Sequence, residues 1–388
     1  MNEHTLFRIC VITCPLGEIA GGHGLTHDLI KVLEPLADEL FMITGNFPED
    51  AVSNPRVHIR NVKYTSNRRP MFIRILKFAL LQLRISLNLI KISKSVDIVI
   101  FYIGSRSFLP PTLSAKLLRK KIVSIVTGSA SKSAREIYAK TVWGYGGVIF
   151  SYIFNLLEKI NYRFADRIIV ESKSIIPEVK LERHAHKIWL SGCFFDTGLF
   201  GAKRNFSQRR NLIGYIGRLT EEKGVMNFVL AIPSIADKRD DVEFLIGGDG
   251  HLRGKIESEL KNDRLSEKVT LTGWIPHEQL TDFFNNLKVL VIPSYTESIP
   301  IVALEAMACG TPVLAAPVGG VPDVITDEEN GFILKDNSPQ CIADAVLRAL
   351  EHPKLDEIAR AGRASVECGF TYQAATEKYR MILNSLVK

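Results

Sequence analysis

Two glutamates eight positions apart in the second half of this sequence have a spacing that suggests chemistry. Glu297 and Glu305 belong to the stretch YTESIPIVALEAMACGTPVL, in which apolar residues nearly fill the interval between them. A helix is predicted from near Pro300 to Cys309, because proline is tolerated in a first turn and the sequence CGTP ends the helical pattern. Eight residues along a helix return to nearly the same face, so both carboxylates are expected to point into one cleft. Carboxylates accept hydrogen bonds from hydroxyl groups, and sugars and riboses offer pairs of hydroxyls.

A second candidate site follows a predicted strand at residues 212–217. The sequence GYIGRLTEEKG places Arg218 directly after this strand and Lys223 five residues later, before the next helix. A guanidinium fork and an ammonium group on one loop can together neutralise a pyrophosphate. We therefore predict that Arg218 and Lys223 bind an anion at the edge of a cleft, with two ordinary surface charges as the alternative.

Glycine-rich segments are further candidates for phosphate contacts. Gly21 and Gly22 follow the first predicted strand and precede a helix, where glycine permits a close backbone approach and the helix N-terminus favours anions. A plain tight turn is the alternative, and the same choice applies to GGDG at 247–250. A dinucleotide site is not expected, because the strand at 40–44 is followed by Gly-Asn where an NAD site requires an acidic residue.

These residues need a scaffold, and the hydrophobic pattern predicts an α/β fold. Short runs rich in Val and Ile alternate with longer segments of helical period, which indicates βαβ units and parallel sheets. A chain of 388 residues is long enough for two doubly wound domains with a cleft between them. The predicted division is a first domain at 1–200, a polar linker at 201–211, a second domain at 212–370 and a one-sided apolar helix at 371–388. Strands are predicted at 7–14, 40–44, 57–62, 97–103, 122–127, 167–172, 187–191, 212–217, 242–248, 268–273, 289–294, 312–316 and 331–334.

The order of the motifs is more specific than any one of them. Gly217-Arg218, Lys223-Gly224, the pair Glu297 and Glu305, AMACGTPVLA and GGVPDVI follow one another along the second half of the chain. This set resembles the nucleotide-sugar-dependent glycosyltransferases of family 4, which have the GT-B fold of two Rossmann-like domains. The resemblance implies that 1–200 binds the acceptor, that 212–370 binds the nucleotide sugar, and that helix 371–388 crosses back to the first domain.

Matched position by position, the resemblance also implies roles for single residues. Arg218 and Lys223 would bind the donor diphosphate, Glu297 the donor sugar and Glu305 the ribose hydroxyls, which makes Arg218, Lys223 and Glu297 the expected catalytic residues. The other expected donor contacts are Gly21, Gly22, Gly217, Gly273, Trp274, Ser298, Ile299, Pro300 and Ile301.

The resemblance implies a retaining hexosyl transfer from a nucleoside-diphosphate sugar, UDP- or GDP-linked, to a hydroxyl of a saccharide or lipid-linked acceptor. Synthesis of a cell-surface polysaccharide or glycolipid is the expected setting. No cofactor and no essential metal are expected, because the chain lacks Asp-x-Asp and two cationic side chains are available instead. A sugar-nucleotide epimerase of the same fold and a noncatalytic nucleotide-sugar-binding module are the alternatives.

The charge of the chain is unevenly distributed. Residues 1–200 contain 27 Lys and Arg against 16 Asp and Glu, and between Ala51 and Arg135 the single acid is Asp97. An excess of this kind predicts an anionic partner. The six cysteines show no metal-ligand spacing, and nothing resembles a zinc, helix-turn-helix or RNP-like motif, so nucleic acid is not expected.

An anionic membrane is the expected partner of the basic half. In the predicted helix 71–94, Lys77, Arg84 and Lys91 recur every seven residues on an apolar background, and Arg74 and Asn88 extend the stripe. This layout is typical of an interfacial helix, although packing against a sheet also explains its apolar residues. Without a hydrophobic signal peptide or a clear spanning segment, a cytoplasmic protein peripheral on the inner face of the cell membrane is expected.

Overall fold

The computed structural model describes residues 6–14, 22–48, 52–62, 71–127, 144–191, 194–195, 197–262, 265 and 267–387. The chain forms two compact units, one of Met1–Ser191 with Tyr372–Lys388 and one of Gly192–Thr371. The boundary after residue 191 differs from the one predicted at 200. The predicted linker 201–211 is part of the second unit, because Phe206 and Arg209 are buried there.

The first unit is built on a parallel sheet of seven strands in the order β3-β2-β1-β4-β5-β6-β7. Its central strands are buried on both faces, so they consist of continuous aliphatic runs such as IVIF in β4. The strands are β1 (Phe7–Ile12), β2 (Ala37–Thr44), β3 (Val57–Asn61), β4 (Ile98–Phe101), β5 (Lys121–Val126), β6 (Arg167–Val170) and β7 (Ile188–Leu190).

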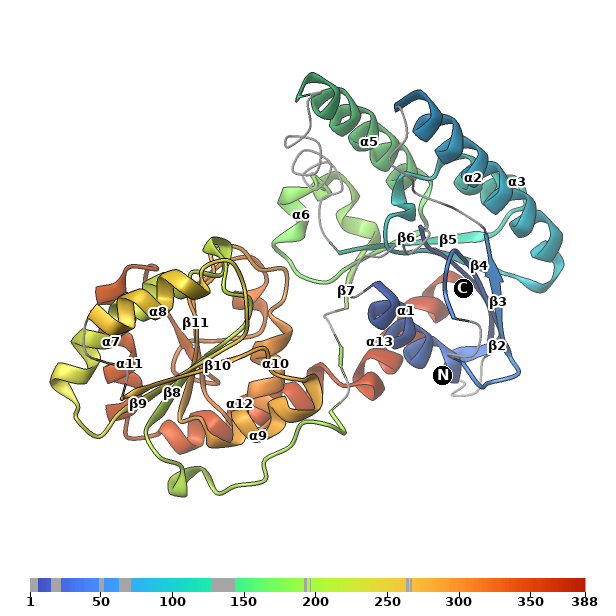
Figure 1. Ribbon diagram of the computed structural model, residues 1–388. Helices are drawn as coiled ribbons and strands as arrows, with labels where there is room; N and C mark the ends of the chain where they lie inside the picture. Colours follow the sequence, from blue (N-terminus) through green and yellow to red (C-terminus); the bar gives the residue numbers. More distant parts are fainter. Residues whose placement is uncertain are drawn as a thin grey trace. The chain divides into compact units, whose positions relative to one another are not determined.

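Helices cover both faces of this sheet (Figure 1). On one face lie α2, α3 and α5, and on the other lie α1 and the C-terminal helix α13. The contact between α13 and α1 includes a hydrogen bond from Thr376 Oγ1 to the Val32 carbonyl oxygen. The helix α13 also contacts the sheet, where Arg167 Nε of β6 donates to Ser385 Oγ at 2.9 Å. The helices are α1 (Gly22–Leu33), α2 (Met71–Ile92), α3 (Leu109–Leu117), α5 (Gly144–Phe164), α6 (Ile175–Glu178) and α13 (Tyr372–Val387).

The second unit has a parallel sheet of six strands in the order β10-β9-β8-β11-β12-β13. Its strands are β8 (Leu212–Ile216), β9 (Glu243–Gly247), β10 (Val269–Gly273), β11 (Val289–Ile292), β12 (Val313–Ala315) and β13 (Phe332–Ile333). Its helices are α7 (Val225–Lys238), α8 (Arg253–Asn262), α9 (Leu280–Asn286), α10 (Ile301–Ala308), α11 (Pro339–Glu351) and α12 (Leu355–Gly369).

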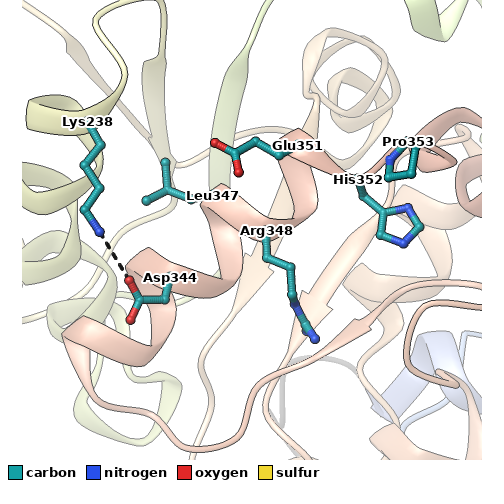
Figure 2. A pocket seen from close by; sticks show the side chains of 7 residues that line it. All are labelled: Lys238, Asp344, Leu347, Arg348, Glu351, His352 and Pro353. Atoms are coloured by element: carbon teal, nitrogen blue, oxygen red, sulfur yellow. Dashed lines mark hydrogen bonds and ion pairs between the residues drawn. The ribbon is translucent and has the colours of Figure 1, made fainter.

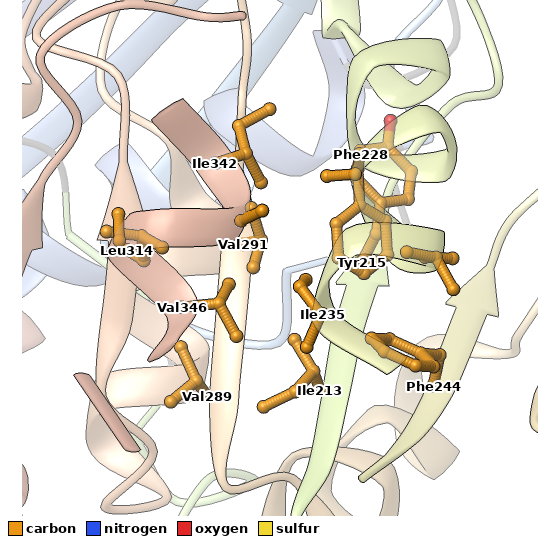
Figure 3. Close-up of a cluster of buried hydrophobic side chains, with 14 of the residues drawn as sticks. Ile213, Tyr215, Phe228, Ile235, Phe244, Val289, Val291, Leu314, Ile342 and Val346 are labelled. Carbon is orange, nitrogen blue, oxygen red and sulfur yellow. The ribbon is translucent and has the colours of Figure 1, made fainter. Parts of the chain in front are cut away.

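A hydrophobic core holds β8 and β11 side by side (Figure 3). Phe228 and Ile235 of α7 and Ile342 and Val346 of α11 pack over the strands, where they meet aliphatic and aromatic residues of β8, β9, β11 and β12. This core fixes the two neighbouring strand ends from which the candidate site is built.

The predicted fold class is confirmed, because both units are parallel α/β layers and every predicted strand is present in the order expected. Among the helices that the structure describes, none combines the length and the apolar character that crossing a bilayer requires.

Candidate functional site

The carboxyl edge of the second sheet contains a cavity at the point where the strand order reverses. The chain adds β9 and β10 on one side of β8 and then returns to add β11 to β13 on the other side. The crevice above β8 and β11 is where open parallel sheets bind ligands. The cavity measures ≈ 400 Å³. Its lining includes seven residues that the sequence analysis singled out: Gly217, Lys223, Glu297, Ile299, Pro300, Ile301 and Glu305.

Lys223 and Glu297 form a direct ion pair in this cavity. Lys223 Nζ lies 2.7 Å from Glu297 Oε1, and the two side chains are 23% and 10% exposed. The same carboxylate oxygen accepts a hydrogen bond from Ser294 Oγ at 2.7 Å, and Asn337 Nδ2 donates to the Ser294 carbonyl oxygen at 3.1 Å. Residues from three separate loops therefore place an ammonium and a carboxylate at one point, as recognition of a phosphate and a neighbouring hydroxyl requires.

Two glycines allow the backbone to pass close to this pair. Gly224 ends the short helix Glu221–Lys223 with φ +65°, and a Cβ there would lie 1.9 Å from the Pro293 carbonyl oxygen. Gly319 has φ +56°, and its Cβ would lie 1.5 Å from the Glu297 carbonyl oxygen. Only glycine fits at such positions, so these residues fix the loops that carry Lys223 and Glu297.

Glu305 lines the same cavity from α10 and is 5% exposed. Burial raises the pKa of Glu305, and a hydrogen bond with His277 opposes that rise. His277 Nε2 lies 2.9 Å from Glu305 Oε1, and the His277 ring packs edge-on against Phe200 at a centroid distance of 5.3 Å. The expectation that Glu297 and Glu305 point into one cavity is met, and His277 orients the more deeply buried carboxylate.

The two predicted cations leave one loop but lie in different environments. The side chain of Arg218 is 67% exposed and pairs with Glu222 at 3.1 Å, whereas Lys223 reaches into the cavity. The Arg218 carbonyl oxygen accepts a hydrogen bond from the buried Tyr215 hydroxyl at 2.6 Å, which holds the start of this loop. A Cβ on Gly217 would lie 3.1 Å from that hydroxyl, so the predicted glycine also shapes the loop.

The remaining predicted donor contacts lie outside the cavity lining. Gly273 ends β10 with φ +73°, and Trp274 after it is 72% exposed; β9 separates both from β8. The Ser298 carbonyl oxygen accepts a hydrogen bond from the Gly320 amide at 2.6 Å, which ties the loop after Glu297 to the loop after β12. Gly22 begins α1 in the first unit, and Gly21 lies outside the described residues.

Sequence reasoning missed four residues that support the site. Ser294, which stands three positions before Glu297, is a polar residue at the carboxyl end of the strand predicted at 289–294, and that placement was a usable indication. Tyr215 gave no such indication, because it looks like an ordinary apolar residue of β8 although its hydroxyl bonds to Arg218 three positions later. His277 and Asn337 gave none either, because their partners stand 28 and 43 positions away in the sequence.

Another cavity, of ≈ 540 Å³, lies beside α7 and α11 (Figure 2). Lys238 and Asp344 approach each other across it at 3.5 Å. Lys238 and Glu351 are the last residues of their helices, which run back toward the amino edge of the sheet. This cavity is therefore not placed where parallel sheets bind ligands, and we assign it no role in the site.

Comparison with known proteins agrees with this location. Residues 199–364 match the family model described as glycosyl transferases group 1. All residues that line the cavity above β8 and β11 lie within the matched segment.

Relatives of known name match part of the chain. Alpha-D-kanosaminyltransferase of Streptomyces kanamyceticus is 34% identical over 148 residues, covering 38% of this chain and 38% of that protein. D-inositol 3-phosphate glycosyltransferase of Corynebacterium diphtheriae is 31% identical over 199 residues, covering 47% and 46%. The chain therefore spans less than half the length of these two curated relatives.

Solved structures match nearly the whole chain at low identity. Anabaena HepE, crystallised with UDP, has a TM-score of 0.73 and 17% identity and covers 97% of this chain and 100% of its own. Sucrose-phosphate synthase from Thermosynechococcus elongatus has a TM-score of 0.69 and 21% identity and covers 98% of each chain. The fold is thus the two-domain α/β architecture of GT-B glycosyltransferases.

The buried carboxylate of Glu305 leads to a stability prediction. We expect Glu305→Gln to be at least as stable as the wild type at neutral pH, because the amide carries no charge into the site. Since the folded pKa of Glu305 is raised above 4.5, its stabilising contribution is present below that pH and is lost as the pH rises through the folded pKa. The Tm difference between variant and wild type should therefore grow in favour of the variant from acid to neutral pH.

Scanning calorimetry across this pH range measures the difference, with Glu357→Gln as a matched change at an exposed glutamate. A clear fall in Tm for Glu305→Gln at neutral pH, with no such fall for the control, would contradict the expected cost of the buried charge.

Proposed function

We propose that this protein is a glycosyltransferase that moves a hexose from a nucleoside-diphosphate sugar to an acceptor hydroxyl. The observation that carries the proposal is the convergence of Lys223, Glu297 and Glu305 on one cavity at the reversal point of a parallel sheet. Lys223 supplies positive charge for a diphosphate, and the two carboxylates supply acceptors for sugar and ribose hydroxyls. The group 1 match and the glycosyltransferase names of the relatives support the same reaction class.

In the proposed reaction, negative charge accumulates on the departing diphosphate. Lys223 lies where it can stabilise this charge, and Arg218 adds a second cation from the same loop once the diphosphate competes for it with Glu222. Glu297 accepts hydrogen bonds from the donor sugar, and Glu305, held by His277, accepts them from the ribose. Stabilisation of the leaving group is the main contribution of the protein in this scheme.

We propose retention at the anomeric carbon, as in the family 4 enzymes that the motifs resemble. No residue of the cavity lining stands out as a nucleophile, so the route we favour lets the leaving phosphate take the proton of the acceptor hydroxyl on the same face of the sugar. Proton NMR of the product gives its anomeric configuration. An inverted product, or a sugar trapped on a side chain, would contradict this route.

The acceptor we propose is a saccharide or a lipid-linked glycan of cell-surface polysaccharide or glycolipid synthesis. Amylovoran biosynthesis glycosyltransferase AmsK of Erwinia amylovora, 27% identical over 239 residues, supports a polysaccharide setting by its name. The donor base we propose is uracil or guanine, and the UDP in the HepE crystals supports the first of these.

Nucleotide binding tests the donor assignment directly. A nucleotide at a hundred times its dissociation constant stabilises the folded state by about 2.7 kcal/mol, so UDP or GDP should raise the Tm clearly. ADP is the control nucleotide, and Lys223→Met should reduce the shift. If neither UDP nor GDP raises the Tm, the proposed donor is wrong.

Turnover distinguishes the transferase from its two alternatives. A sugar-nucleotide epimerase rearranges or hydrolyses the donor without an acceptor, and a binding module takes up the donor without any reaction. Release of nucleoside diphosphate that depends on added acceptor supports transfer. Release that is equally fast without acceptor, or donor binding with no release, favours one of the alternatives.

We further propose that the reaction requires no divalent metal and no cofactor. The positive charge that a metal would give to the diphosphate is available from Lys223 and Arg218. Transfer rates measured after treatment with EDTA are therefore expected to equal untreated rates. A rate that falls with EDTA and returns with Mg²⁺ or Mn²⁺ would show that the side chains are insufficient.

A further inference from the structure

The outer surface of the first unit has an apolar layer that the proposed reaction does not use. On α2, six large aliphatic side chains are between 44% and 57% exposed, and they lie on the side of the helix away from the sheet. These residues are Ile75, Leu76, Leu80, Leu83, Leu87 and Ile90. Isolated exposed leucines are normal on a protein surface, but six along one helix face form a continuous strip.

Exposed apolar side chains are also present on the neighbouring helices. Figure 1 shows α2, α3 and α5 side by side on one face of the sheet, and Phe78 of α2 contacts Phe154 of α5 at a ring-centroid distance of 6.0 Å. The exposed residues of α3 include Leu117, which is 85% exposed, and those of α5 include Tyr152, which is 74% exposed. Leu113, Ile153 and Leu156 are also exposed on these two helices. We call this surface of α2, α3 and α5 the apolar face.

The charges on the apolar face have one sign. The sequences of the three helices contain a single acidic residue, Glu158, and it is buried 3.6 Å from Arg106. The described basic residues that are exposed among the apolar ones are Arg84, Lys91, Lys116, Lys159 and Arg163. An apolar surface interleaved with Lys and Arg and without exposed acids complements a surface that is apolar inside and negatively charged outside.

We propose that the apolar face docks on an anionic phospholipid bilayer, with α2, α3 and α5 lying on its surface. The leucines and isoleucines enter the boundary between head groups and acyl chains, and the basic residues contact the head groups. The proposed contact is peripheral, because the three helices lie along the bilayer surface. This proposal does not rest on the proposed function, because it uses other residues and is measured without donor or acceptor.

Co-sedimentation of the full chain with vesicles tests the docking. The protein is expected to sediment with vesicles that contain phosphatidylglycerol and much less with pure phosphatidylcholine, and added salt should weaken the binding. Leu83→Ser/Leu87→Ser should reduce binding about tenfold or more. Leu230→Ser on α7 of the second unit, which makes the same substitution at a 42% exposed leucine, should not reduce it.

Charge reversal separates the electrostatic part. Arg84→Glu/Lys91→Glu should weaken binding to anionic vesicles, whereas Lys255→Glu/Lys261→Glu, at exposed lysines of α8, should leave it unchanged. Circular dichroism and thermal unfolding confirm that each variant is folded. The proposal is overturned if wild type and the serine variant bind vesicles equally, or if the wild type binds none. A wild-type dimer that the serine substitutions make monomeric would instead identify the face as an interface between copies.

Discussion

Lys223→Met should lower the rate of sugar transfer by about two to three decades, which corresponds to about 2.7–4 kcal/mol of transition-state stabilisation. Methionine keeps much of the length of lysine but removes the charge that faces the departing diphosphate. It also leaves the 10% exposed carboxylate of Glu297 without its partner at 2.7 Å, so the geometry of the sugar contact is lost as well. Acceptor-dependent release of nucleoside diphosphate measures the effect.

Lys238→Met is the matched control, because Lys238 also ends near a carboxylate, that of Asp344, but lies at the far end of α7. It should leave the rate unchanged. Combining Lys223→Met with Glu297→Gln should cost less than the sum of the single effects, since residues that act as a unit are not additive. Full activity in a double Arg218→Ala/Lys223→Ala variant would rule out the role proposed for both cations.

Most of the fold follows from patterns that single segments carry. Strands buried on both faces need apolar side chains on both, so IVIF of β4 is recognisable without knowledge of its neighbours. The start of β2 was predicted at residue 40, but the strand begins at Ala37 because Ala37 pairs with Phe7 of β1 and Glu39 pairs with Arg8. Asp38 and Glu39 at the start of the strand interrupt the apolar pattern, so only the pairing with β1 shows that they belong to β2.

The predicted linker shows a different limit of sequence reasoning. The segment 201–211 is rich in basic and polar residues, and such segments are usually exposed connections. In the structure Arg209 is buried, and its guanidinium donates to the Cys309 carbonyl oxygen and to Thr311 Oγ1, each at 2.7 Å. A long-range partner therefore turns a residue that looks like surface into part of the core beside α10.

The residues of the candidate site likewise fall into those that the sequence predicts and those that it does not. Glu297, Glu305 and Lys223 were predictable because each follows a strand or lies on a helix face with a defined direction. His277 was not, because it stands 28 positions from Glu305 and reaches it only where the segment after β10 packs against α10. Arg218 was placed on the correct loop, but its pairing with Glu222 depends on side-chain conformation that spacing does not determine.

Gly319→Ala should damage both stability and activity, although no side chain of the site is changed. A Cβ at this position would lie 1.5 Å from the Glu297 carbonyl oxygen, and the residue has φ +56°, which disfavours alanine. The backbone must shift, and the shift moves the residue that pairs with Lys223. We expect a loss of more than about 1 kcal/mol in the free energy of unfolding.

The transfer rate of Gly319→Ala should fall further than its loss of stability explains, because transfer requires the Glu297 carboxylate to stay within reach of the Lys223 ammonium group. Gly254→Ala is the matched control: Gly254 lies within α8, a Cβ there meets no atom within 4 Å, and alanine in place of a compatible glycine stabilises by about 0.4–1 kcal/mol. Chemical denaturation and transfer rates at a temperature where both variants are folded separate the two effects. A Gly319→Ala variant with wild-type rates would mean that the close backbone approach at Glu297 has no part in placing the carboxylate.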